Sequence, residues 1–82
     1  MARELGHLAL SDNGFLFDTF TGFTYTLNGV GTAILRGLIA GLEREDVLDV
    51  LLERYEVTYE VASRDLEQFI SRMEELRLLG EG

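Results

Sequence analysis

DTFTGFTYTLNGVGTAILRGLIAG, residues 18–41, is the stretch that decides the fold. Apolar side chains alternate with threonines from Phe23 to Leu27, the pattern of a strand with one packed face and one wet face. Beyond Asn28 the apolar residues recur at helical spacing. The side-chain oxygen of Asn28 can accept a backbone N–H of the first turn. The stretch therefore predicts a strand and a helix that meet without a loop.

The segment before this stretch predicts two more strands. Leu5–Leu10 is short and apolar, Ser11–Gly14 has turn residues, and Phe15–Phe17 resumes the apolar pattern. In the loop that follows, Asp18 can accept nearby backbone N–H groups and Gly22 can adopt a positive φ. Together with residues 23–27, these segments predict a three-stranded antiparallel meander.

Three helices are expected after the meander. The first spans about Gly29–Ala40 and is closed by Gly41. The second spans about Arg44–Tyr55, with apolar residues on one side and acids on the other. The third runs from about Tyr59 to Leu79, before Gly80, with Thr58 as its N-cap. The predicted fold class is α+β, a winged helix-turn-helix-like arrangement of three strands followed by three helices.

The composition predicts one domain, residues 1–82, that folds in water. Of the 82 residues, 46% are hydrophobic, and no stretch approaches the roughly 18 consecutive apolar residues of a membrane span. There is no cysteine, and the first residues lack the apolar core of a secretory signal. We expect a cytoplasmic protein that does not bind a membrane.

The charge balance argues against nucleic acid as a partner. The chain carries a net charge of −8, and its seven basic residues are arginines scattered among fifteen acids. A nucleic-acid interface needs a positive stripe because phosphate contacts supply much of its affinity. The third predicted helix, the recognition helix of a DNA-binding alternative, holds five acids: Glu60, Asp65, Glu67, Glu74 and Glu75.

The sequence offers no catalytic or metal-binding set. His7 is the only histidine, and without cysteine it cannot join the ligand cluster that zinc or iron requires. We expect His7 to be a partly exposed strand residue. No serine or threonine has an obvious base and orienting partner. We therefore predict no enzyme activity, no metal and no cofactor, and expect the free edges of the sheet to be the interacting surface.

The chain resembles the PqqD-like family, also called RiPP recognition elements. The residues that carry the resemblance are Asp18-x-x-Thr21-Gly22-x-x-Tyr25-x-Leu27-Asn28-x-x-Gly31-x-x-Ile34-Leu35, then Leu48-x-x-x-Leu52-x-x-Tyr55-x-Val57 and Asp65-Leu66-x-x-Phe69-Ile70. The resemblance implies the same order of strands and helices. It also implies a non-catalytic adaptor that binds the leader segment of a ribosomally made precursor peptide as an added strand. Such adaptors present the leader to a modifying enzyme, often a radical SAM protein.

Two departures from the family pattern carry structural expectations. Arg77 stands where the family commonly has glycine, so the last turn of the third helix is expected to run on. Glu43 and Arg44 stand where Ser or Thr is usual, which leaves the second helix without an obvious cap.

The peptide is expected in a cleft between the last strand and the third helix. Tyr25, Phe69 and Met73 would form its floor, and the arginines beside it would pair with acidic leader residues. The candidate peptide-binding residues are Phe23, Thr24, Tyr25, Thr26, Leu27, Arg64, Asp65, Phe69, Arg72 and Met73. The alternative is that Phe69 is an ordinary core residue and that Arg64 and Arg72 are ordinary surface residues, without a role in binding.

Two other functions stay open at this point. One is a winged-helix DNA-binding module, and the other is a structural domain whose sheet edge pairs with a second copy. The sequence accordingly allows a monomer or a homodimer, and it does not identify the precursor, the modifying enzyme or the product.

Overall fold

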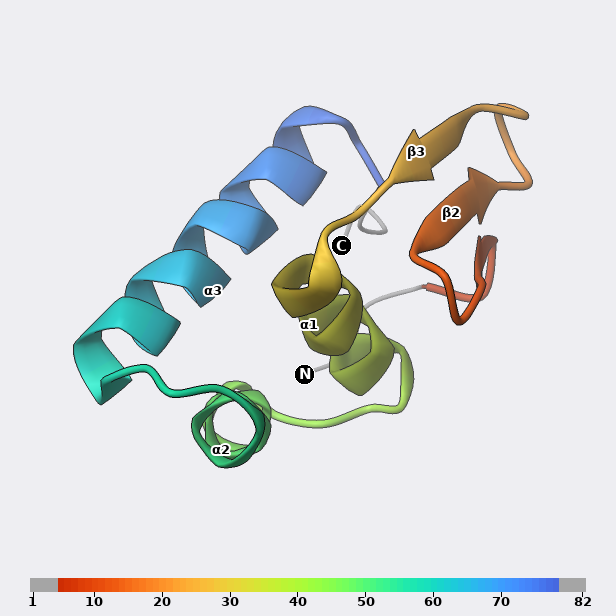
Figure 1. The fold of residues 1–82 in the computed structure, drawn as a ribbon. Coiled ribbons are helices and arrows are strands. Elements are labelled where there is room, and N and C mark those ends of the chain that lie inside the picture. The colour runs from red at the N-terminus through yellow and green to blue at the C-terminus, as the bar shows by residue number, and fades with distance from the viewer. Residues whose placement is uncertain (1–4, 79–82) are drawn as a thin grey trace.

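A computed structural model of the chain describes residues 5–78 (Figure 1). Three strands precede three helices: β1 (Leu8–Leu10), β2 (Phe15–Asp18), β3 (Thr24–Thr26), α1 (Gly29–Ile39), α2 (Arg44–Arg54) and α3 (Tyr59–Glu75). The predicted α+β fold class is confirmed. The predicted starts of the three helices are also correct.

The sheet is an antiparallel meander in the order β1-β2-β3. Leu16 in the central strand lies opposite Leu10 on one side and Tyr25 on the other. Leu16 is fully buried, whereas Phe15 and Phe17 on the opposite face of β2 stay exposed. One face of the sheet therefore covers the core and the other faces solvent.

The tight connections around β2 depend on Asp18 and two glycines. The Asp18 carboxylate accepts the backbone N–H groups of Phe20 at 2.8 Å and Thr21 at 3.4 Å, and Gly22 has a φ of 81°, as predicted. Gly14 has a φ of 88°, and a Cβ there would lie 2.7 Å from the Leu27 carbonyl oxygen. Only glycine fits at residue 14, because its backbone passes against the end of β3.

The helix caps position α1 and α3. The Asn28 side chain accepts the Gly31 N–H at 2.7 Å, and the Thr58 hydroxyl accepts the Val61 N–H at 3.2 Å. Both N-caps were predicted. Gly41, with a φ of 90°, closes α1 in a left-handed conformation, also as predicted.

The start of the first strand was predicted wrongly. Residues 5–7 are not strand, and the Leu8 N–H instead donates to the Leu5 carbonyl at 3.0 Å in a turn. His7 is not a partly exposed strand residue, since only 8% of it is accessible. Its ring stacks on Phe20 with the centroids 4.5 Å apart, so an aromatic side chain covers the imidazole.

The third helix ends earlier than predicted. It stops at Glu75, and Arg77, expected to continue the helix, has a φ of 58°. The Leu78 N–H then donates to the Met73 carbonyl at 2.9 Å, which completes a Schellman motif. Leu78 is 1% exposed. Burial of Leu78 thus offsets the strain of a left-handed arginine. The predicted residues 79 and 80 lie outside the described part of the chain.

The second helix does have a cap, contrary to expectation. Glu43 takes the N-cap position and forms a capping box with Asp46, whose carboxylate accepts the Glu43 N–H at 3.4 Å. The carboxylates also lie at the positive end of the helix dipole, which favours them over neutral caps there.

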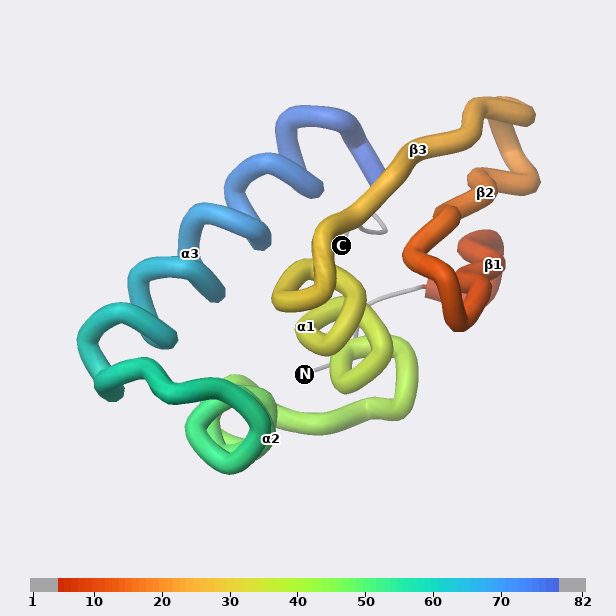
Figure 2. Tube along the Cα trace, in the orientation of Figure 1, coloured from red at the N-terminus to blue at the C-terminus, as the bar shows by residue number. Residues whose placement is uncertain are grey.

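Helix α1 lies between the sheet and α3 in both chain views (Figures 1 and 2). Its buried residues belong to one core with leucines of the sheet and the inner faces of α2 and α3. No helix within residues 5–78 has both the length and the apolar character that crossing a membrane requires. The central position of α1 leaves β3 and α3 on either side of its first turn.

Candidate functional site

Strand β3 is an open edge of the sheet. The Leu27 N–H donates to the Gly14 carbonyl at 2.8 Å, and the Asp18 N–H donates to the Phe23 carbonyl at 2.9 Å. The backbone hydrogen-bonding groups of Phe23 and Leu27 therefore face β2. Hydrogen-bonded pairs alternate in an antiparallel ladder, so the intervening Thr24 and Thr26 direct their N–H and C=O groups away from β2. In the described sheet no strand lies on that side. An extended chain could pair with both threonines.

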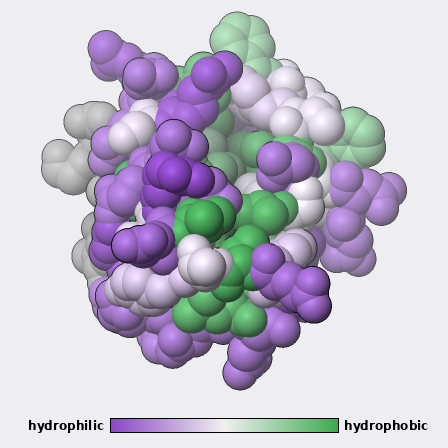
Figure 3. All heavy atoms as spheres, turned by 60° about the vertical axis from the view of Figure 1, so that its left-hand side comes forward, coloured by the Kyte–Doolittle hydropathy of each residue, from purple (hydrophilic) through white to green (hydrophobic). Residues whose placement is uncertain are grey.

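A groove runs beside this open edge. Its first part is a cavity of about 320 Å³ between β3, the first turn of α1 and the end of α3. Its second part, about 440 Å³, continues along α3 and shares Asn28, Gly31, Phe69 and Arg72 with the first. We call the two parts the β3–α3 groove. Figure 3 shows apolar atoms gathered within hydrophilic surroundings on the side of the molecule that carries α3.

The floor of the groove depends on Gly31. A Cβ at this position would lie 3.2 Å from both the Phe69 ring and the Asn28 side-chain oxygen. The missing side chain therefore lets the partly exposed Phe69 ring pack against the first turn of α1. Met73, 2% exposed, lies four residues further along α3 and lines the same part of the groove. The groove thus has a rigid apolar base, suited to burying an apolar side chain of a ligand.

Charged groups lie at the rim of the groove. Asp65 and Arg72 occupy the same stripe of α3 as Phe69, because they lie four residues before and three after it. An extended ligand in the groove would therefore lie beside one acidic and one basic side chain.

Outside the groove, a hydrogen bond from the Tyr59 hydroxyl to the Glu45 carboxylate, 3.1 Å long, raises the pKa of Tyr59 above its usual value.

The structure brings most of the predicted site residues to the groove. Lining it are Tyr25, Thr26, Leu27, Asp65, Phe69, Arg72 and Met73. Thr24 belongs to the open edge. Phe23, 63% exposed, and Arg64 line neither part. Arg64 lies one residue before Asp65, which turns it by about 100° around the helix.

Sequence reasoning missed seven lining residues: Asn28, Val30, Gly31, Ile34, Gln68, Leu76 and Leu78. Asn28 is predicted as a cap and Gly31 is used only as part of the family pattern, although their place just after the strand could have indicated the groove. Leu76 and Leu78 were assigned to a continuing helix. The reversal at Arg77, which brings Leu78 back to the groove, has no glycine to announce it.

An open edge beside an apolar groove suits an extended peptide: backbone groups pair along the edge while side chains enter the groove. Among residues 5–78 no group of three or more His, Cys, Asp or Glu side chains could hold a metal ion.

Known proteins resemble the chain in sequence and in structure. The family model described as coenzyme PQQ synthesis protein D (PqqD) matches residues 13–79. The solved structure of TbiB1 in complex with the TbiA(beta) leader peptide is 29% identical, with a TM-score of 0.77, over 88% of this chain and 85% of that one. Lasso peptide synthetase B1 complexed with the leader peptide is 28% identical, with a TM-score of 0.76, over 90% and 88%. Comparison with curated proteins finds no match.

Proposed function

The chain belongs to the coenzyme PQQ synthesis protein D (PqqD) family, and from this premise we propose that it binds the leader segment of a ribosomally made precursor peptide. The leader adds as a strand to β3 and inserts side chains into the β3–α3 groove. The observation that carries the proposal is the unpaired edge at Thr24 and Thr26, directly beside a groove with an apolar floor. Two relatives of similar fold are solved as leader-peptide complexes.

Side chains in the groove decide the affinity in this proposal. Each backbone hydrogen bond contributes about 0.5–1.5 kcal/mol, whereas a buried apolar side chain contributes about 1.5–3 kcal/mol before ordering costs. The binding residues are Thr24, Tyr25, Thr26, Leu27, Asp65, Phe69, Arg72 and Met73, with Asn28, Gly31, Leu76 and Leu78 added from the geometry. Phe23 and Arg64, which lie outside the groove, are left out.

The protein acts as an adaptor rather than a catalyst in this proposal. A non-catalytic role is what membership of this family implies, and the two similar solved structures are leader-peptide complexes. The bound leader is presented to a modifying enzyme of the kind that works with this family, such as a radical SAM protein. Because ribosomes make the precursor, we place this step in the cytoplasm.

The winged-helix DNA-binding alternative has no supporting observation. Helix α3 carries five acids, and the chain as a whole has a net charge of −8. Phosphates would be repelled along this helix.

The test is to search the neighbourhood of the gene of this chain for short peptide genes and to titrate the leader segment of each encoded peptide onto the protein by calorimetry. We expect a dissociation constant on the order of 1 μM, as for a small interface. Amide hydrogen exchange should slow at Thr24 and Thr26, whose N–H groups are unpaired in the free protein. A scrambled peptide of the same composition is the control. Binding without protection at these amides, or tight binding of a DNA duplex at low salt instead, contradicts the proposal.

A further inference from the structure

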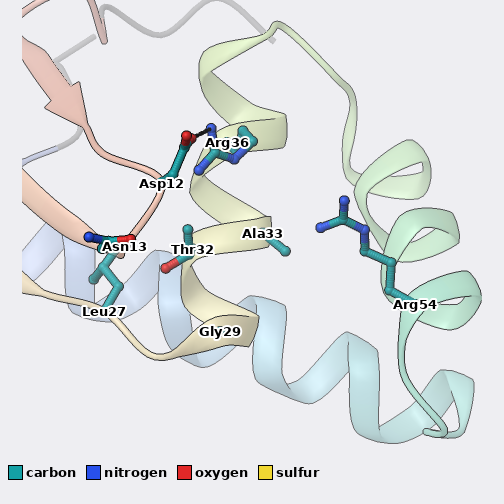
Figure 4. Close-up of a pocket in the computed structure, with 8 residues that line it drawn as sticks. All are labelled: Asp12, Asn13, Leu27, Gly29, Thr32, Ala33, Arg36 and Arg54. Atoms are coloured by element: carbon teal, nitrogen blue, oxygen red, sulfur yellow. Dashed lines mark ion pairs between the residues drawn. The ribbon is translucent and has the colours of Figure 1, made fainter.

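A second, polar cavity lies on the other side of α1 (Figure 4). It has a volume of about 520 Å³, opens to solvent and is bordered by the β1–β2 turn, α1 and the end of α2. Two arginines, Arg36 from α1 and Arg54 from α2, line it together with Asn13 and Thr32. We call this cavity the arginine pocket. Among its eight lining residues the only acid is Asp12, so the pocket is locally positive in a chain of net charge −8.

Within residues 5–78, no acidic side chain pairs with Arg54. Its neighbours on the helix surface, three and four residues away, are uncharged, so no acid can reach it along α2. Its guanidinium points across the cavity toward α1 in Figure 4, and within residues 5–78 it makes no hydrogen bond or ion pair. Arg64 on α3 differs, because Glu60 and Glu67 occupy its neighbouring positions on the helix surface.

Arg36 is held only loosely. Its guanidinium lies 3.5 Å from the Asp12 carboxylate and donates to the Ser11 carbonyl at 3.4 Å. The Asp12 side chain is 98% exposed, and an exposed ion pair of this kind contributes little. An incoming carboxylate could therefore share Arg36 with Asp12 or replace it.

The arginine pocket adjoins the β3–α3 groove. Leu27 lines both cavities, and Gly29, which has no side chain, lies in the wall of the pocket directly after Asn28 of the groove. A peptide paired with Thr26 can leave the groove past Asn28 and pass over the first turn of α1. About three extended residues, at roughly 3.3 Å each, cover this turn.

We propose that the arginine pocket binds an acidic side chain of the same precursor peptide, on the flank that leaves the groove beside Asn28. This inference rests on the proposed function, because the groove delivers the peptide to the pocket. The carboxylate pairs with the guanidinium of Arg54, whose two parallel N–H donors match its two oxygens. The pocket thus extends recognition beyond the strand-forming segment and favours leaders with an acid at one position.

The experiment compares Arg54→Gln with Arg64→Gln, which removes the same charge from an exposed position outside both cavities. Each protein is titrated with the leader peptide and with variants in which each Asp or Glu is changed singly to Asn or Gln. We expect Arg54→Gln to weaken binding roughly three- to tenfold, and Arg64→Gln to change it less than about twofold. Neutralising one particular acid of the peptide should weaken binding to the wild-type protein by the same three- to tenfold. The same peptide change should cause no further loss of affinity with the Arg54→Gln protein.

Five results overturn the inference. Equal losses of leader affinity for the two arginine variants would indicate a general charge effect. If every acid of the leader can be neutralised singly without loss of affinity, the pocket has no ligand in this peptide. Sodium acetate or phosphate that shifts the Arg54 side-chain resonance while Arg54→Gln leaves leader affinity unchanged would indicate a free-anion site only. A wild-type protein that binds no leader overturns both proposals, whereas binding with Thr24 and Thr26 protected but insensitive to Arg54 overturns this one alone.

Discussion

Two cavities meet at Leu27, and they differ in what lines them. The β3–α3 groove has an apolar base, and an unpaired strand edge borders it. The arginine pocket has two guanidiniums and no unpaired strand beside it in the described sheet. In our proposals, binding in the groove draws mainly on burial and backbone pairing, which salt hardly affects, whereas charge pairing in the pocket would be screened by salt. We therefore assign affinity to the groove and selection among leaders to the pocket.

The largest effect is expected from Phe69→Ala, which removes the apolar base of the groove. The lost burial should weaken leader binding by about ten- to a hundredfold. Because Phe69 is only partly buried, the variant should stay folded, which circular dichroism can verify. Phe15→Ala, at a 52% exposed position on the solvent face of the sheet, is the matched control and should bind the leader as the wild type does. If Phe69→Ala binds the leader with wild-type affinity, the apolar base of the groove does not supply the affinity and the two cavities do not differ in this way.

The next effect concerns the strand edge. Thr26→Pro removes an N–H that faces away from β2, so the ladder within the protein should survive while one bond to the leader is lost. We expect about a tenfold loss of affinity, from the missing bond and the space that the ring takes. Thr26→Val keeps the N–H and should bind within about twofold of the wild type. Equal behaviour of the two variants in calorimetry would argue against strand addition.

A smaller effect should come from salt. Raising the salt concentration from about 50 to 500 mM should weaken leader binding a few-fold, because the arginine contacts are screened. The variant Arg54→Gln should lose a measurable part of this dependence, with the remainder due to Arg72 at the rim of the groove, and Phe69→Ala should keep it in full. Titrations of all three proteins at each salt concentration measure the slopes. Parallel slopes for the wild type and Arg54→Gln would show that charge pairing lies elsewhere.

The smallest effect is expected at the end of α3. Arg77 has a φ of 58°, and Arg77→Gly relieves this strain while keeping the turn that buries Leu78 beside the groove. Stability should rise by about 1 kcal/mol or less, seen as a thermal midpoint a few degrees higher. Leader affinity should not change, because the lining of the groove stays the same. A lower midpoint would mean that the Arg77 side chain itself stabilises this end of the helix.

Local patterns in the sequence were enough for the order of the elements. The alternation in residues 23–27, the helical spacing after Asn28 and the turn residue Gly22 act over a few residues, and each predicted feature appears in the structure. The part of α3 that faces β3 was also predicted, since Phe69 and Met73 lie on its apolar stripe.

By itself, the sequence determined the fold class, the open edge at β3 and half of the residues that line the groove, because the spacing of residues along the chain and the family resemblance point to these features. Only the tertiary structure decided the end of α3, the burial of His7 and the meeting of Arg36 with Arg54. Each of these depends on contacts between distant residues: Leu78 with the core, Phe20 with His7, and α1 with α2. Such contacts can outweigh a local preference, as burial of Leu78 outweighs the strain at Arg77, so local spacing does not reveal them.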